Sequence, residues 1–322
     1  MPANSEDATQ PGSAQTDTAR VAILMGTKDG AAFLTEQLDS IATQTHPNWR
    51  LIVSDDGSTD ETRKIVKRFV AAHPQTTELR DGPRRGVCAN FLSLAADPAI
   101  AADYFAFSDQ DDLWHPDKLG RALNWLASVP AGEPAVYCGR TDLMTTDGRV
   151  YGRSPLFAKP PSFQNALVQS LAGGNTMVFN RAAKRLLERA GPLDVVLHDW
   201  WTYQLVSAAG GVIYYDREPM VQYRQHPHSL IGSNVGSRAR LVRVRLMLGG
   251  RFRSWNELNL AALRSLPETI MTAANRTTLQ LFAEARQASL FKRLGLLRRS
   301  GVYRQTWLGN IGLLVGALLK RI

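Results

Sequence analysis

Cysteine is scarce in this sequence, and the apolar runs are short. Only Cys88 and Cys138 occur in 322 residues, and neither belongs to a C-x-x-C pair. Two cysteines exclude a disulfide framework and a cysteine-based zinc or redox motif, so the expected compartment is a reducing cytoplasm. Residues 1–19 have neither a basic start nor an apolar core. We expect them to form a disordered leader rather than a signal peptide or an anchor.

The two common glycine-rich phosphate-binding loops are also missing. The sequence contains neither G-x-x-x-x-G-K-[ST] nor G-x-G-x-x-G. Such loops cradle phosphates with backbone N–H groups, so a nucleotide bound by this chain must have its pyrophosphate neutralised in another way. A divalent cation held by carboxylates is the economical candidate.

Acidic residues are rare in the last quarter of the chain. Residues 237–322 contain 16 Lys+Arg and 3 Asp+Glu, a net charge of +13, and the remaining 22 Lys+Arg and 26 Asp+Glu leave −4 on residues 1–236. The final apolar stretch has roughly 13 residues, short of the ~20 that span a bilayer. We expect residues 237–322 to form basic amphipathic helices on an anionic membrane surface, and packing of these helices on the body is the alternative. Nucleic acid is not an expected partner.

Apolar strands alternate with amphipathic helices in the first half of the chain. Buried strands are predicted at 21–26, 51–53, 78–80 and 104–107. Helices are predicted between them at 31–43, 65–69 and 87–95, the second of them opened by a capping box from Ser58 to Glu61. This alternation predicts an α/β fold with a mostly parallel sheet flanked by helices. The same sheet is expected to be completed by later strands at 135–143, 173–179 and 212–215, with later helices at 163–171, 181–189 and 200–208.

Polar residues gather where three of these strands end, in the segments 27–29, 54–56 and 108–112. Ligands of such sheets bind beyond the carboxyl ends of the strands, so the three segments are expected to form one site. In the third segment, Asp109, Asp111 and Asp112 repel one another unless a cation lies among them, and their oxygens suit Mg²⁺ or Mn²⁺. The alternative is that they are first-turn acids, favoured by the dipole of a helix that begins at Pro116.

Several segments, in this order and spacing, resemble glycosyltransferase family 2, the inverting nucleotide-sugar transferases of GT-A fold. They are VAILMGTKDGAAFLTEQLDSI, LIVSDDGSTDET and FAFSDQDDLWHPDKL. Three later segments resemble its rhamnosyltransferase-like branch, namely GGNTMVFN, LHDWWTYQLVSAAGGVIYYD and YRQHPHSLIG. The resemblance implies a GT-A, Rossmann-like domain over residues 20–236, with a nucleotide-binding half at 20–115 and an acceptor half at 116–236.

The resemblance also implies roles for the residues that match the donor side of the family. Asp56 matches the contact to the nucleotide base, with Asp55 beside it, and Thr27 borders the nucleotide. Asp109 matches the residue near the ribose and the metal, and Asp111 matches the direct metal ligand. The expected cofactor is therefore a divalent cation, Mg²⁺ or Mn²⁺.

Further candidates lie outside these two motifs. Arg84 is a candidate donor contact, with a solvated turn as the alternative. His226 is a candidate to reach the diphosphate or complete the metal shell, although surface or core histidines are commoner. The family's aromatic-Asn-Gly segment is replaced here by residues 28–30, which puts base stacking there in doubt.

Candidates on the acceptor side come from the second half of the chain. The resemblance matches Asp199 to the catalytic base, and a helix N-cap is the alternative. Gly173, Gly174 and Asn175 match the segment that lines the acceptor side. Trp200 is a candidate to stack on a sugar face, with packing in the core as the alternative.

The function that the resemblance implies is a metal-dependent inverting glycosyltransferase at the cytosolic face of the inner membrane. The donor is a dTDP- or UDP-sugar, with dTDP-rhamnose suggested, and the acceptor is a hydroxyl of a lipid-linked or cell-envelope glycan. The absence of Q-x-x-R-W and of spanning helices favours transfer of one sugar over polymerisation. The alternatives are a sugar nucleotidyltransferase and a non-catalytic, membrane-docked scaffold of envelope glycan assembly.

Overall fold

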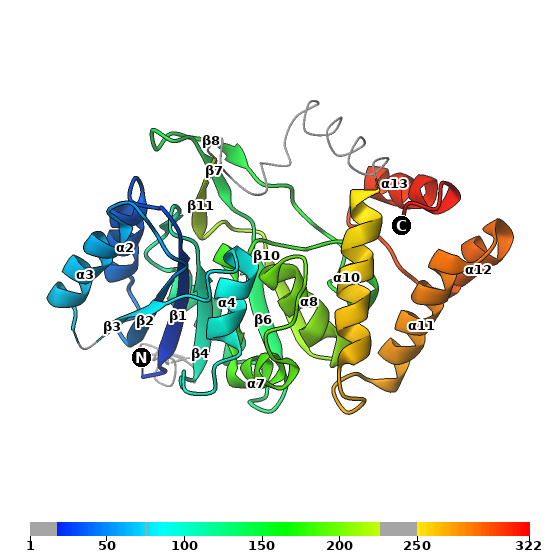
Figure 1. Cartoon of the computed structure of the whole chain (residues 1–322), viewed down its shortest axis with the longest axis horizontal. Helices are drawn as coiled ribbons and strands as arrows, with labels where there is room; N and C mark the ends of the chain where they lie inside the picture. The colour runs from blue at the N-terminus through cyan, green and yellow to red at the C-terminus, as the bar shows by residue number, and fades with distance from the viewer. Residues whose placement is uncertain (1–17, 75, 226–249) are drawn as a thin grey trace, which may run out of the picture.

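The computed structural model describes residues 18–74, 76–225 and 250–322. Most of the predicted leader, the candidate ligand His226 and residues 237–249 of the basic segment therefore lie outside the described residues. Figure 1 shows a twisted sheet flanked by helices, with the helices of the C-terminal part of the chain at the right of the view.

The main sheet has the order β10-β6-β9-β4-β1-β2-β3. Strand β9 is antiparallel to β4 and β6, and the other neighbouring pairs are parallel. The predicted α/β fold with a mostly parallel sheet is thus confirmed. The strands of this sheet are β1 (Val21–Thr27), β2 (Trp49–Asp55), β3 (Thr77–Asp81), β4 (Tyr104–Ser108), β6 (Ala135–Gly139), β9 (Val178–Asn180) and β10 (Val212–Asp216).

Helices cover both faces of the sheet, which explains why its strands are apolar throughout. In β1, Leu24 belongs to one hydrophobic core, and Ile23 and Met25 belong to the other. Because side chains alternate along a strand, two buried faces require a continuous apolar run. One core includes residues of α4 (Val87–Ala95), α7 (Arg181–Ala190) and α8 (His198–Ala208), and the other includes residues of α2 (Leu34–Ala42), α3 (Thr62–Ala72) and α5 (Lys118–Leu126).

A small second sheet lies next to the carboxyl ends of the main strands, at the top of Figure 1. Its order is β5-β11-β7-β8, and its strands are β5 (Leu113–Trp114), β11 (Val221–Arg224), β7 (Asp142–Met144) and β8 (Val150–Arg153). The prediction of one strand over 135–143 is therefore wrong. The chain leaves the main sheet at Arg140, whose guanidinium donates to the carbonyl of Ser154, and then joins the second sheet.

Three other local predictions are wrong. Residues 174–176 form the short 3-10 helix η1 (Gly174–Thr176) instead of a strand, and the helix expected over 163–171 is only α6 (Phe163–Ala166). The capping box is not formed, because the Ser58 hydroxyl donates to Asp55 while Asp60 accepts from the N–H of Thr62. The hydroxyl oxygen of Ser58 also accepts from the N–H of Asp29 at 2.9 Å, so it is engaged by the loop after β1 and not by the helix.

The C-terminal extension is helical, as expected. It consists of α10 (Arg251–Ser265), α11 (Ala273–Gln287), α12 (Leu290–Ser300) and α13 (Trp307–Leu318). Leu263 of α10 and Phe282 of α11 belong to the same core as α4 and α8, so packing on the body is the correct alternative for these two helices. Within the part of the chain that the structure describes, no helix is long and apolar enough to cross a bilayer.

Candidate functional site

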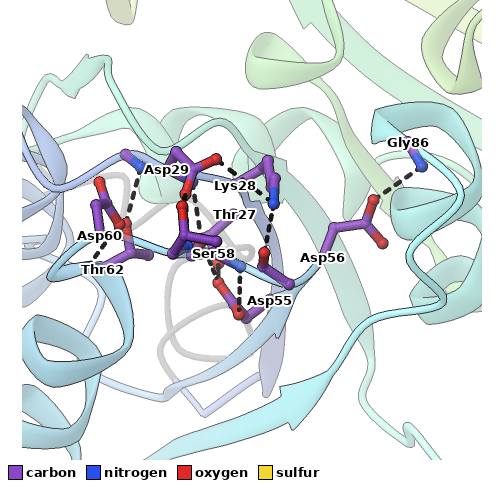
Figure 2. A network of polar contacts seen from close by, with 12 residues as sticks. Thr27, Lys28, Asp29, Asp55, Asp56, Ser58, Asp60, Thr62 and Gly86 are labelled. Carbon is purple, nitrogen blue, oxygen red and sulfur yellow. Dashed lines mark hydrogen bonds and ion pairs between the residues drawn. The ribbon is translucent and has the colours of Figure 1, made fainter.

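The loops after β1 and β2 are joined by a dense polar network (Figure 2). Asp55, at the end of β2, is almost fully buried and accepts from Thr27 Oγ1 at 3.1 Å, Ser58 Oγ at 2.5 Å and Arg63 Nη1 at 3.0 Å. Burial alone would raise the pKa of Asp55, but the hydrogen bonds from Ser58 and Arg63 outweigh it and hold the pKa below its usual value. Asp55 and Thr27 therefore shape this loop from inside.

Asp56 points the other way, toward the turn that precedes α4 (Figure 2). Its carboxylate accepts from the N–H of Arg84 at 2.5 Å and the N–H of Gly86 at 2.8 Å. Arg84 has a left-handed backbone, with a φ of 57°, and its side chain packs on Gly57. Asp56, Gly57 and Arg84 line an open pocket of about 800 Å³ that also includes Lys28 and Asp81.

Gln110 ties the loop after β1 to the loop after β4. Its side chain accepts from the N–H of Lys28 at 2.8 Å and donates to the carbonyl of Lys28 at 2.9 Å. A Cβ at Gly30 would lie 2.2 Å from Gln110 Oε1, so a side chain at Gly30 would displace this amide. Gln110, which lies between Asp109 and Asp111, therefore sets how closely the ends of β1 and β4 approach each other.

The acids after β4 are electrostatically coupled to one another. Burial raises the pKa of Asp109 to about 8, with further contributions from the negative charges of Asp111 and Asp199. Burial also raises the pKa of Asp112, and Asp111 and Asp109 add to that effect. Like charges that approach in a low-dielectric site disfavour ionisation. Asp109 and Asp111 therefore share one strongly negative region with Asp199.

Asp112 is oriented away from that region into the interior. It is fully buried, and it accepts from Asn175 Nδ2 at 2.5 Å and from the N–H of Arg224 at 3.1 Å. Arg224 is itself buried, and its guanidinium donates to the carbonyl of Asp111 at 2.9 Å and to Glu36 at 2.7 Å. Asp112 and Arg224 thus fix the backbone that carries Asp109 and Asp111.

A buried lysine lies behind these acids. Lys118 is fully buried, and its Nζ is 3.2 Å from the ring centroid of Trp114. No hydrogen-bond partner of Nζ occurs among residues 18–74, 76–225 and 250–322. Burial lowers the pKa of Lys118, and the charges of Asp112 and Asp109 oppose that effect. The ammonium is thus a weak internal counter-charge to the acids.

Asp199 lies in the first turn of α8 and is 8% exposed. Its carboxylate accepts from the N–H of Gly174 at 3.1 Å and from its neighbour Trp200 N–H at 2.5 Å. Burial raises the pKa of Asp199 to about 6. The predicted alternative, a helix N-cap, is wrong, because Leu197 occupies that position. A buried carboxylate that titrates near neutral pH has the properties of a general base.

His198 fixes the short helix that supplies the Gly174 N–H. Its ring stacks on Phe91 with a centroid separation of 4.0 Å, and burial lowers its pKa to about 3, so the ring is neutral. A Cβ at Gly174 would lie 2.3 Å from His198 Nε2. Gly174 is therefore needed for the 3-10 helix to pack this closely against α8.

Two further residues predicted on the acceptor side have buried polar groups. Asn175 is 3% exposed and directs its amide to Asp112, as described above. Trp200 is 2% exposed, and its indole Nε1 donates to the carbonyl of Ala166 at 2.7 Å. Gly173 precedes the 3-10 helix, and its carbonyl accepts from Thr176 Oγ1 at 2.8 Å. These residues support the segment around Asp199.

The donor set fits a divalent cation that binds together with a diphosphate. Among the described residues, no three His, Cys, Asp or Glu side chains converge to hold a metal by themselves. Mg²⁺ is usually held by one or two carboxylates plus substrate phosphates, so a pair such as Asp109 and Asp111 is sufficient. Burial raises the pKa of Asp109, and the negative charges of Asp111 and Asp199 add to that effect, so a cation at this place would favour the ionised form.

Four residues that support the site were not singled out from the sequence. They are Arg63, Gln110, Lys118 and Arg224. Arg224 is 112 positions from Asp112, to which its N–H donates. Gln110 had a weak signal, since it stands inside the acidic segment, but nothing in the sequence indicates that it bonds to Lys28.

Comparison with protein families gives one clear match. The model of glycosyl transferase family 2 matches residues 22–187. A dTDP-rhamnosyl transferase, RfbG of Shigella flexneri, is 29% identical over 234 residues, which are 69% of this chain and 78% of that protein. An uncharacterized glycosyltransferase of Rickettsia typhi is 26% identical over 221 residues, 64% of each chain.

Solved structures with the same fold carry nucleotide sugars. A mannosyltransferase of Pyrobaculum calidifontis in complex with GDP-Man and Mn²⁺ aligns with a TM-score of 0.53 and 21% identity, covering 94% of this chain and 87% of that chain. TarS 1–349 of S. aureus in complex with UDP-GlcNAc aligns with a TM-score of 0.51 and 14% identity, covering 88% and 93%. These likenesses confirm the GT-A fold.

Proposed function

Because the chain belongs to glycosyl transferase family 2 and is therefore a glycosyltransferase that uses a nucleotide sugar, we propose that it transfers one sugar with inversion from a dTDP- or UDP-sugar. The S. flexneri relative is a dTDP-rhamnosyl transferase, which makes dTDP-rhamnose the first donor to test. The acceptor that we propose is a hydroxyl of a lipid-linked or cell-envelope glycan. The observation that carries the proposal is the buried carboxylate of Asp199, coupled to the acidic pair after β4.

The donor is proposed to occupy the open pocket at the ends of β1 and β2. Asp56 and Arg84 line this pocket, and Asp55 and Thr27 stiffen its floor. Each oxygen of Asp56 retains a lone pair beyond its N–H partner, so the carboxylate can still accept from a nucleobase N–H. Arg84 is placed to meet a phosphate or the base.

The cation is proposed to be Mg²⁺ or Mn²⁺, held by Asp109 and Asp111 together with the donor. When bound, it would act as a Lewis acid toward the leaving diphosphate. His226 remains a further candidate ligand, outside the described residues. The chain's own contribution is to hold the two carboxylates in place through Gln110, Arg224 and the internal bonds of Asp112.

Asp199 is proposed as the base that takes the proton from the acceptor hydroxyl. An alcohol is a weak nucleophile at neutral pH, so a positioned carboxylate must accept its proton as attack proceeds. The bond from the acceptor oxygen to the anomeric carbon then forms as the bond to the diphosphate breaks. One displacement inverts the anomeric configuration and requires one carboxylate for proton transfer. The N–H groups of Gly174 and Trp200 orient that carboxylate.

The test is release of nucleoside diphosphate from a panel of dTDP- and UDP-sugars, with and without Mn²⁺ and acceptor. We expect release to need the cation and to be abolished in Asp111→Ala. Asp147→Asn, which changes an exposed acid in the turn before β8, is the matched control. Release of pyrophosphate from a nucleoside triphosphate and a sugar 1-phosphate, in a separate assay, would indicate a nucleotidyltransferase. Unchanged diphosphate release by Asp111→Ala would contradict the proposed metal site, and the absence of release from every donor would favour a scaffold.

A further inference from the structure

Helix α13 exposes large apolar side chains to solvent, the reverse of the usual pattern in a helix that packs on a domain. The two residues of α13 that are buried, Gly316 and Ala317, are small, and Leu313 packs partly buried against the core. The residues that α13 turns outward are large: Trp307 is 75% exposed, Leu314 is 51% exposed, and Ile311 and Leu318 are exposed as well. These four residues are spaced at i, i+4, i+7 and i+11, so they form one continuous stripe. We call this stripe the α13 face.

The orientation of the α13 face is fixed by a fully buried arginine. Arg293 of α12 donates from Nη1 to the carbonyl of Ala317 at 2.8 Å and from Nη2 to the carbonyl of Ala288 at 2.6 Å. Arg286 of α11 donates to the carbonyl of the terminal Ile322 at 2.9 Å. Turning the stripe inward would break the bond from Arg293 to Ala317 and leave one N–H of a buried guanidinium without an acceptor.

Basic side chains adjoin the C-terminal end of the α13 face. Lys320 and Arg321 are exposed directly after the helix. A Cβ at Gly250 would lie 3.2 Å from Arg321 Nη1, so this arginine reaches the start of α10, where Arg251 is also exposed. The helix itself contains no charged residue. An apolar face with cations at its end complements a surface that is apolar inside and anionic outside.

We propose that the α13 face docks this enzyme on an anionic lipid bilayer, with α13 lying in the plane of the interface. A helix of 12 residues is about 18 Å long at 1.5 Å per residue, which fits lying on a bilayer and not crossing it. A second copy of the chain is a poorer partner, because α13 contains no acidic residue that could pair with Lys320 and Arg321, whereas an anionic bilayer supplies such a charge. In Figure 1, α13 lies at the upper right, next to the upper end of α10.

The experiment is flotation of the full-length protein with vesicles of phosphatidylcholine alone or with about 30% phosphatidylglycerol. We expect binding to the anionic vesicles that weakens as salt rises. Leu314→Glu is expected to lower the partition constant at least tenfold. The double variant Lys320→Ala and Arg321→Ala is expected to lower it on the order of tenfold on anionic vesicles only. Leu258→Glu, at an exposed leucine of α10, is the matched control and is expected to bind like the unmodified protein.

Two outcomes would overturn the proposal. One is binding to anionic vesicles that is absent, or that Leu314→Glu leaves unchanged. The other is a dimer in light scattering that Leu314→Glu converts to a monomer, since this would assign the face to a second copy. Because Leu314 is exposed, the melting temperature of Leu314→Glu is expected to match that of Leu258→Glu, and this readout separates loss of docking from loss of folding. None of these measurements uses the glycosyltransferase reaction, so the docking proposal can fail independently of the proposed function.

Discussion

Replacing Asp199 by asparagine should separate activity from stability. The carboxylate is 8% exposed and accepts two N–H groups, from Gly174 and Trp200. Asparagine has nearly the same shape but cannot take a proton, and it offers only one oxygen to these two donors. The substitution therefore removes the proposed base and disturbs one hydrogen bond while it leaves the packing intact.

Two opposing terms set the effect on stability. A pKa raised from 3.8 to about 6 means that the charged carboxylate is disfavoured in the folded state by about 3 kcal/mol at neutral pH. That penalty is absent below the unfolded pKa and builds up as pH rises through about 6, and asparagine removes it. The N–H that loses its acceptor costs about 1–3 kcal/mol. We therefore expect a net change in stability of at most about 2 kcal/mol.

The effect on activity should be larger and should depend on pH. Loss of a general base lowers the rate by about 10²- to 10⁴-fold, which corresponds to about 3–5 kcal/mol in the barrier. The base must be deprotonated to act, so kcat/KM of the unmodified enzyme should fall about tenfold per pH unit below about 6. This acidic limb should disappear in Asp199→Asn.

The assay is nucleoside diphosphate release in the presence of acceptor, measured between about pH 5 and 8.5, with thermal unfolding at each pH. An Asp199→Asn variant that retains more than a tenth of the activity would refute the role of Asp199. An acidic limb with the same midpoint in both proteins would assign that titration to another group. A loss of activity matched by a large loss of stability would point to a structural role only.

Three further substitutions test other parts of the site. Asp109→Asn should abolish transfer yet raise the stability at neutral pH by on the order of 1 kcal/mol, or ~2 °C in Tm. The reason is that it removes a carboxylate whose raised pKa shows that its ionised form is disfavoured in the folded state. A lower Tm would contradict this prediction. Gly174→Ala should destabilise the fold by about 1–3 kcal/mol through its clash with His198, whereas Gly295→Ala, with open space around it, should not, as paired chemical denaturation curves can show. Gln110→Ala should lower kcat/KM for the donor about tenfold or more while Tm changes by only ~2 °C. The reason is that it removes the two hydrogen bonds to Lys28 that join the loops after β1 and β4, without opening the core. Unchanged kinetics would show that these two hydrogen bonds are dispensable.

The features that could be predicted from the sequence are those with a local signal. The strands β1, β2 and β4 are continuous apolar runs, so their period and their polar ends could be identified without knowledge of their neighbours. The convergence of Asp55, Asp56 and Asp109 follows from the rule that parallel strands share one carboxyl edge. The edge could therefore be located before any contact was known.

The features that could not be predicted depend on partners far along the chain. The guanidinium of Arg224 bonds to the carbonyl of Asp111 and to Glu36, residues 113 and 188 positions away. The strand expected over 135–143 breaks where Arg140 finds the carbonyl of Ser154. The capping box of Ser58 fails for a similar reason, because its hydroxyl oxygen accepts from the N–H of Asp29 in the loop after β1. Such competition between local and tertiary partners leaves no periodic trace in a sequence.

The hydrogen bonds also separate the acids into those that build the site and those that serve a ligand. Asp55 and Asp112 are buried and accept hydrogen bonds from other groups of the chain, so these two residues position the loops of the site. Burial raises the pKa of Asp109, and the negative charges of Asp111 and Asp199 raise it further. The buried Lys118, whose Nζ lies over the ring of Trp114, opposes this only in part. A divalent cation that arrives with a diphosphate would relieve this repulsion at the moment of binding. We therefore expect donor and cation to bind cooperatively, and we expect the charge of the bound cation to offset part of the burial effect that raises the pKa of Asp199.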